Sequence, residues 1–161
     1  MVQEEQFNKL SRKSVTAWRL NGILWSLGIW LLPAYFGGLN YFGGDSPLWV
    51  TALASFIALL LTFLLVFLFP EIRWRQWRYK IDEHEIDLHH GIWFTRRTLV
   101  PVKRVQHVDT RQGPILRNYD LADVVISTAA TTHKIPALAV ETADEARSEI
   151  SRFARKAKED V

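Results

Sequence analysis

Two long apolar stretches without a charged side chain occupy most of the first half of the chain. They run over Leu20–Gly44 and Ser46–Pro70, and only Asp45 separates them. The hydrocarbon core of a bilayer is about 30 Å thick, so a helix of about 20 apolar residues crosses it. Each stretch is long enough for one crossing. The sequence therefore predicts a two-helix transmembrane hairpin over residues 20–70, with spans at about 20–36 and 47–69.

The basic residues predict how this hairpin is oriented. They flank it on both sides and are missing from the connection between the spans: Lys9, Arg12, Lys13 and Arg19 precede it, and Arg73, Arg75, Arg78 and Lys80 follow it. Because cytoplasmic loops retain Lys and Arg, both termini and residues 71–161 are expected in the cytoplasm of a multi-pass cell-membrane protein. A cleaved signal peptide is the alternative for the first stretch, but that stretch is too long and lacks an Ala-x-Ala-like site.

The composition of the spans favours an anchor over a transporter. Neither span contains Asp, Glu, Lys, Arg or His, and carriers and proton relays need such groups inside the membrane. Ala54, Ala58 and Thr62 recur every four residues and form a stripe of small side chains on which a second helix can pack closely. The stripe predicts packing against the first span of the same chain, with a homo-oligomer seam as the alternative.

Residues 1–19 are expected to be a cytoplasmic lead. Over Gln6–Arg19 the apolar residues are spaced so that they approximate one helical face, with basic residues around it, which suits a short interfacial helix. Disorder of the first residues is the alternative. The formal net charge of +3 lies mostly in the segments that flank the spans, so no nucleic-acid partner is expected. The chain has no Cys, which excludes disulfides, thiol catalysis and Cys-ligated metal sites.

From Trp77 onward the apolar pattern changes to the alternation that is typical of half-buried strands. The predicted strands are 77–81, Glu85–His89, Ile92–Val100, Arg104–Thr110, Leu121–Thr128 and Thr132–Ile135, with one helical turn over Ile115–Tyr119. A helix should follow, because Thr142 and Glu145 form a capping box and Ala146, Ile150 and Phe153 begin an apolar stripe. The predicted fold is α+β: a bent antiparallel sheet or partial barrel whose open end an amphipathic helix covers.

Several motifs in this region are similar to those of a known family. They are Trp77-Arg78-Tyr79-Lys80, Glu85–Gly91, Val100-Pro101, Arg104–Asp109, Gln112–Leu116, Ile126–Ala129 and Ile135–Leu138. Together with the preceding hairpin, they resemble the bacterial pleckstrin-homology-like (PH-like) domain of the YdbS family of small membrane proteins. The resemblance covers essentially the whole chain and implies a PH-like β-barrel capped by the C-terminal helix. It also implies a partner, namely a larger membrane protein that carries several PH-like domains. Many relatives have a second Gly where this chain has Tyr119-Asp120.

Three kinds of chemical site are disfavoured by the sequence. His89 and His90 are adjacent on a strand and face opposite sides, so they do not chelate a metal together. Ser127, His107 and Asp109 could approach one another, but Ser127 has no nucleophile elbow. In eukaryotic PH domains, Lys and Arg in the first strand-to-strand loop hold inositol phosphates; here that loop, residues 82–85, is acidic. No catalytic residue, metal or cofactor is expected.

Two functions from different classes follow from these observations. The first is a membrane-anchored, non-enzymatic interaction module that assembles with another membrane protein in envelope or stress physiology. Its partner-binding loop is predicted at Gln112, Gly113, Pro114 and Arg117, because loops on rigid scaffolds commonly carry contacts. The alternative is a sensor of anionic lipid headgroups of the inner leaflet, whose predicted contacts are Arg96, Arg97, Lys103, Arg104 and Arg111. A membrane-bound enzyme is the weakest interpretation, since no residue points to one.

Overall fold

The computed structural model describes residues 7–91 and 94–159. The chain separates into two compact units. One is a helical hairpin over Val15–Ile72, and the other combines the residues up to Ser14 with those from Arg73 onward. We call the second the β unit. Two residues of the predicted strand Ile92–Val100, namely Ile92 and Trp93, lie outside the described residues, as does Gln6 at the start of the predicted interfacial helix.

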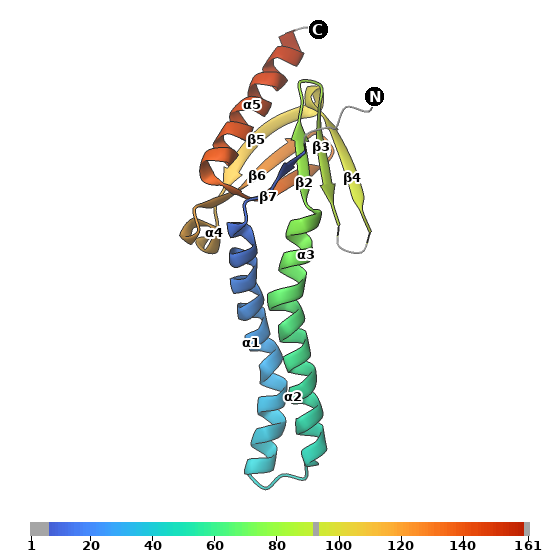
Figure 1. Cartoon of the computed structure of the whole chain (residues 1–161), viewed down its shortest axis with the longest axis vertical. Coiled ribbons are helices and arrows are strands. Elements are labelled where there is room, and N and C mark those ends of the chain that lie inside the picture. The colour runs from blue at the N-terminus through green and yellow to red at the C-terminus, as the bar shows by residue number, and fades with distance from the viewer. Residues whose placement is uncertain (1–6, 92–93, 160–161) are drawn as a thin grey trace. The chain divides into compact units, whose positions relative to one another are not determined.

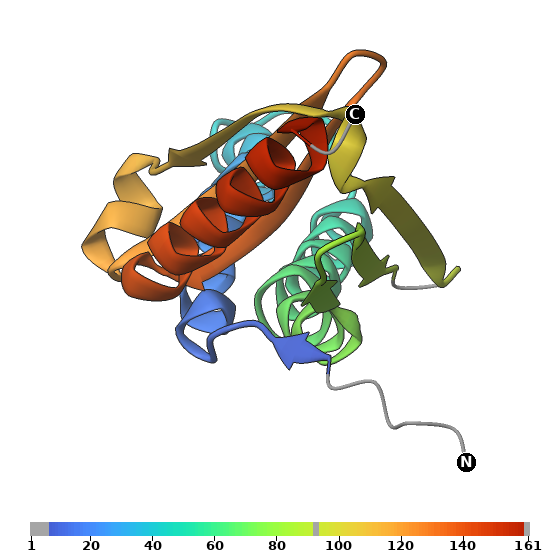
Figure 2. The same ribbon diagram turned by 90° about the horizontal axis from the view of Figure 1, so that it is seen from above.

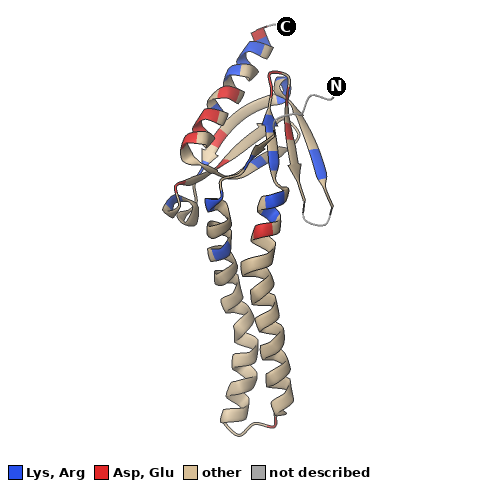
Figure 3. Ribbon diagram, viewed as in Figure 1, with Lys and Arg blue, Asp and Glu red and all other residues tan. Residues whose placement is uncertain are grey.

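The hairpin consists of two antiparallel helical stretches that run side by side (Figure 1). The first is α1 (Lys13–Tyr41); the second is continuous through α2 (Leu48–Phe63), the π-helical turn η1 (Leu64–Leu68) and α3 (Phe69–Gln76). Each stretch has 29 residues and is apolar enough to cross a membrane. Figure 3 shows that charged residues are absent from the middle of both stretches. These features confirm the two predicted membrane helices.

Both membrane helices are longer than predicted, and each extension has a local cause. The structure continues α1 to Tyr41, where a flexible connection was expected. The Asn40 side-chain amide donates hydrogen bonds of 2.9 Å to the Phe36 carbonyl and to the Thr51 hydroxyl, which stabilises the extra turn. The second stretch continues past Pro70, where it was expected to end. The π turn ends at Leu68, two residues before Pro70, and the amide of the following Phe69 donates to the Leu64 carbonyl. The backbone thus adjusts around the missing proline N–H.

The stripe of small residues packs within the hairpin. Ala54 and Ala58 are buried, and the Thr62 hydroxyl accepts a 3.2 Å hydrogen bond from the Trp30 indole on α1. This arrangement matches the intrachain packing that the sequence favoured. Ala54 and Ala58 are therefore covered within the single chain.

The β unit contains two antiparallel sheets. The first has the order β1-β2-β3-β4, and the second has the order β5-β6-β7. The strands of the first sheet are β1 (Asn8–Lys9), β2 (Arg78–Ile81), β3 (Glu85–His90) and β4 (Arg96–Pro101). Those of the second are β5 (Val105–Arg111), β6 (Leu121–Thr128) and β7 (Thr132–Ala139), and a short turn η2 (Val102–Arg104) joins the two sheets. Most predicted strands lie within one or two residues of these bounds.

The helix α5 (Val140–Glu159) packs against all three strands of the second sheet and against η2, as Figure 2 shows from above. Its buried residues are Ala143, Ala146, Ile150 and Ala154, which confirms the predicted apolar stripe. Six consecutive residues of β6, Leu121–Ile126, are buried. Because successive strand residues face opposite sides, both faces of β6 are covered, as expected for its continuous apolar sequence.

The predicted capping box at Thr142 is wrong. The helix begins two residues earlier, at Val140, directly after β7 ends at Ala139. The Val140 amide donates to the Asp120 carbonyl at 3.1 Å, so a contact from the distant α4–β6 turn satisfies this amide. Thr142 and Glu145 therefore lie inside the first turns of α5.

The predicted interfacial helix over 6–19 is wrong in its first half; residues 13–19 are helical but belong to α1. Asn8 and Lys9 form β1 and pair with Tyr79 and Arg78 of β2. The Trp74 indole donates a 3.0 Å hydrogen bond to the Leu10 carbonyl, which holds the same segment in the β unit. Pairing with the edge of β2 gives hydrogen-bond partners to backbone N–H and C=O groups, which at the ends of a short helix would lack them.

Candidate functional site

The β unit contains a cavity of about 630 Å³ lined by basic side chains. We call the four residues Lys103, Arg104, His133 and Lys158 the basic pocket. They come from three elements: η2 contributes Lys103 and Arg104, β7 contributes His133, and the last turn of α5 contributes Lys158. No Asp or Glu lines the cavity within the part of the chain that the structure describes.

The turn η2 fixes where its two cations project. Pro101 ends β4, and the following Val102 is fully buried while its amide donates to the His84 carbonyl at 3.0 Å. Burial of Val102 directs Lys103 and Arg104 outward. Val100 and Val105, on either side, are each 2% exposed and contribute apolar walls to the cavity.

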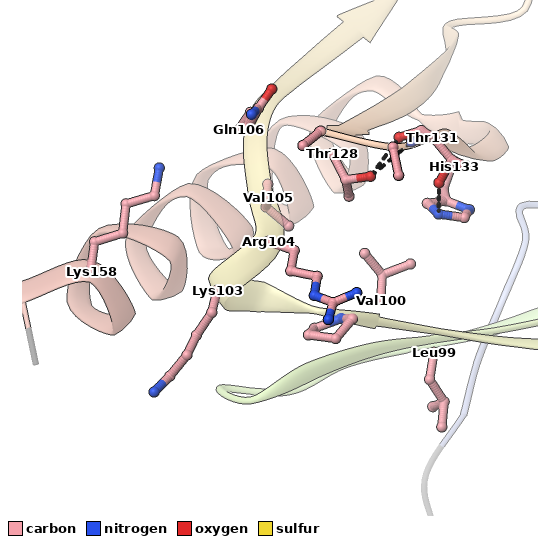
Figure 4. A pocket seen from close by; sticks show the side chains of 13 residues that line it. Leu99, Val100, Lys103, Arg104, Val105, Gln106, Thr128, Thr131, His133 and Lys158 are labelled. Carbon is pink, nitrogen blue, oxygen red and sulfur yellow. Dashed lines mark hydrogen bonds between the residues drawn. The ribbon is translucent and has the colours of Figure 1, made fainter. Parts of the chain in front are cut away.

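The opposite wall is the tight turn between β6 and β7. The Thr128 hydroxyl donates to the Thr131 carbonyl at 2.8 Å and accepts from the Thr131 amide at 3.1 Å. The Thr131 hydroxyl lies 2.9 Å from Nε2 of His133. Figure 4 shows the Arg104 guanidinium reaching toward this wall, while Lys103 and Lys158 point to the other side of η2. The cavity therefore presents positive charge and hydrogen-bond donors beside an apolar surface, which suits an anion.

The structure does not gather the five predicted lipid contacts into one stripe. Arg96 and Arg97 begin β4, Lys103 and Arg104 follow its end, and Arg111 is at the far end of β5. A strand of six or seven residues spans roughly 20 Å, so these groups lie at different ends of the sheets. Lys103 and Arg104 instead line one cavity with His133 and Lys158. The sequence did not bring these four residues together, because His133 and Lys158 lie about 30 to 55 residues further along the chain.

Arg97 is engaged inside the β unit. Its Nε and Nη2 atoms donate to Oδ2 of Asp87 at 2.9 and 2.6 Å. Asp87 is 4% exposed, and these bonds compensate its buried charge. The structure therefore assigns Arg97 a stabilising role that its sequence position did not reveal.

The predicted partner loop is exposed and held in place. Gln112, Gly113, Pro114 and Arg117 are all exposed, and Pro114 begins the short helix α4 (Pro114–Asn118). The Gln112 side-chain amide donates to the Leu121 carbonyl at 2.9 Å. After α4, Asp120 adopts φ 54°, a left-handed conformation that Asp tolerates better than most residues. The turn therefore forms here without a glycine.

The first strand-to-strand loop is acidic in the structure, as it is in the sequence. Asp82 and Glu83 are exposed there, and Glu83 lies 3.6 Å from Lys156 of α5. A hydrogen bond from the Glu83 amide lowers the pKa of Asp82, which keeps its carboxylate charged. This loop repels phosphate, in contrast to the basic pocket.

The residues of the other disfavoured sites have specific places. His90 stacks on Trp77 with ring centroids 5.0 Å apart, and His89 lies beside Asp87. His107 pairs directly with Ser127 across β5 and β6, but no hydrogen bond joins them to each other or to Asp109 among the described residues. Within residues 7–91 and 94–159, no group of three potential ligands is placed to hold a metal ion.

Comparison with known proteins agrees with the hairpin and the two-sheet unit. The model of the bacterial PH domain family matches residues 27–154, so the chain is a membrane protein that belongs to this family. It is 43% identical over 160 residues to the transmembrane protein YdbS of Bacillus subtilis (strain 168), which covers 99% of this chain and all of the relative. This similarity confirms the resemblance to the YdbS family. No solved structure matches the chain. The fold and the family point to a membrane-anchored PH-like module rather than to a catalyst.

Proposed function

We propose that the chain is a non-enzymatic interaction module that the hairpin holds at the cytoplasmic face of the cell membrane. In this proposal the β unit binds another membrane protein, and the first candidate is a larger protein with several PH-like domains. The process would belong to envelope or stress physiology. The observation that carries the proposal is the loop Gln112–Arg117, which is exposed yet anchored by the Gln112–Leu121 bond.

The physical advantage of such a module lies in tethering. The hairpin confines the β unit to the membrane in which its partner also lies. This raises the effective concentration of the two proteins, so a contact that is weak in solution becomes well occupied. A small, preorganised loop is sufficient under these conditions. The uncharged interior of the hairpin supports an anchoring role over a transport role.

The test is crosslinking and co-purification from native membranes in mild detergent. We expect the same partner with the full chain and with Arg152→Glu, an exposed control on α5. The hairpin alone (residues 1–76) should lose the partner, and Arg117→Glu should reduce its recovery at least tenfold. Recovery of the same partner with the hairpin alone would remove the binding role of the β unit. Undiminished recovery with Arg117→Glu would exclude the loop as the contact.

Recognition of anionic headgroups by a basic face is the competing function. It requires Arg96 and Arg111 to act together although they belong to different sheets. The test is binding of the purified chain to anionic vesicles at several salt concentrations. Salt-sensitive binding that is lost in the double variant Arg96→Gln with Arg111→Gln would favour this function over a protein partner.

A further inference from the structure

We infer that the basic pocket binds a phosphate ester. This inference goes beyond the proposed function, because the pocket and the partner loop are separate places. The pocket lies at the Val105 end of β5, whereas the loop follows Arg111 at the other end. One site can therefore be altered without changing the other.

The first support is uncompensated charge. Among the residues that the structure describes, none of Lys103, Arg104 and Lys158 makes an ion pair. The acid in the neighbouring turn, Glu83, is the partner of Lys156. Arg104 reaches into a cavity that no described carboxylate lines, and Lys103 and Lys158 border it from the other side of η2. The local potential is therefore positive and attracts a negatively charged group.

The second support is the arrangement of donors. Arg104 reaches from η2 toward Thr131 and His133 on the facing turn (Figure 4). A guanidinium binds phosphate oxygens through two parallel N–H groups, and a hydroxyl paired with an imidazole adds donors on the opposite side. An anion between these walls would be held from two directions.

The third support is size and polarity. A cavity of about 630 Å³ is in the range of sites for small organic molecules rather than for bare ions. Val100 and Val105 contribute apolar wall beside Arg104, so an organic group attached to the phosphate finds an apolar surface. The ligand class is therefore a phosphate ester, either free in solution or part of a lipid headgroup.

The test uses the full chain in lipid nanodiscs made of phosphatidylcholine, with two probes. Glycerol 3-phosphate is titrated by calorimetry as the soluble ester. Phosphatidic acid, added to the nanodisc lipids, is the membrane-bound ester, and its binding is followed by phosphorus NMR. We expect saturable binding of at least one probe. Arg104→Gln should weaken it at least tenfold, and His133→Gln and Lys158→Gln should weaken it less.

Arg155→Gln is the matched control, because it removes the same charge from an exposed position on α5 that does not line the cavity. It should bind as the native chain does. Binding of glycerol 3-phosphate identifies a soluble source, and Arg104-dependent binding of phosphatidic acid alone identifies a lipid source. Absence of saturable binding for both probes, or equal weakening by Arg104→Gln and Arg155→Gln, would overturn the inference. Neither result would bear on co-purification through the partner loop, so the two proposals fail independently.

Discussion

Asp87 is a buried charged residue in the first sheet of the β unit. It is 4% exposed, and Arg97 donates two hydrogen bonds to its Oδ2 atom across the β3–β4 pair. The other oxygen, Oδ1, lies 3.3 Å from Nε2 of His89, whose ring contacts Phe7 at a centroid distance of 4.8 Å. A buried carboxylate is costly without hydrogen-bond donors. Among the described residues Oδ1 accepts no hydrogen bond, so the compensation comes from the two Arg97 bonds.

Arg97→Gln should destabilise the β unit by about 1–3 kcal/mol, since it leaves the Asp87 carboxylate without its charged donor. Arg96→Gln removes the same charge from the adjacent exposed position and should change stability by less than about 0.5 kcal/mol. Chemical denaturation of the two variants in detergent measures the difference. Equal stabilities would mean that the Asp87–Arg97 pair does not support the sheet.

His90 makes the stability of the β unit sensitive to acid. Burial, followed by the positive charges of Arg96 and Arg73, lowers the pKa of His90 below its ordinary value of 6.5. Its Nδ1 atom is buried and has no hydrogen-bond partner among the described residues. As the pH falls below 6.5, the unfolded chain takes up a proton that the folded chain resists, so stability decreases toward the folded-state pKa.

We therefore expect the melting temperature to fall between pH 7.5 and pH 5.5, and His90→Gln should reduce this fall. His107→Gln, an exposed position on β5, serves as the control and should retain it. Thermal unfolding in detergent at the two pH values measures the effect. The same pH dependence in the native chain and in His90→Gln would contradict the role of His90.

At the scale of elements, the hairpin depends on one close approach between its helices. A Cβ atom at Gly22 would lie 2.6 Å from the Leu65 carbonyl oxygen, and Leu65 belongs to the π-helical turn η1. The two helices therefore come close at the position where the second is locally widened. Polar contacts at Trp30–Thr62 and Asn40–Thr51 join them elsewhere.

Gly22→Ala should weaken the hairpin by about 1–3 kcal/mol, because the added methyl group forces the backbones apart. Gly28→Ala is the matched control in the same helix, since a Cβ there meets no atom within 4 Å. Unfolding of both variants by SDS in mixed micelles measures the difference. Equal unfolding midpoints would show that the approach at Gly22 is not required.

The strand β7 shows where local sequence signals are insufficient. Pro136 predicted a strand end after Ile135, but β7 continues to Ala139 through a register shift opposite Ala122–Val124. Ala137 takes φ 51° there, and its amide donates to Oδ1 of the buried Asp123 at 2.9 Å. A side chain from the neighbouring strand therefore stabilises a conformation that neither Pro136 nor Ala137 encodes.

At the scale of the whole molecule, the elements that the sequence predicts correctly are those with a regular spacing of apolar residues. The two membrane helices, the strand Leu121–Thr128 and the apolar stripe of α5 each follow from a regular spacing of apolar residues. The strand Asn8–Lys9 is too short to have a period, and the basic pocket combines η2, β7 and the end of α5. Such a site depends on tertiary structure, so sequence reasoning found Lys103 and Arg104 but not His133 and Lys158.

We expect the hairpin to span the membrane and to keep the β unit in the cytoplasm. Because the native chain has no Cys, single-cysteine variants report position without background. Asp45→Cys lies in the turn between the two spans, and Ala130→Cys lies in the exposed turn between β6 and β7. Each is treated in intact cells with a membrane-impermeant maleimide. We expect labelling of Asp45→Cys in intact cells and labelling of Ala130→Cys only after permeabilisation. Labelling of Ala130→Cys in intact cells would show that the β unit lies outside the cytoplasm.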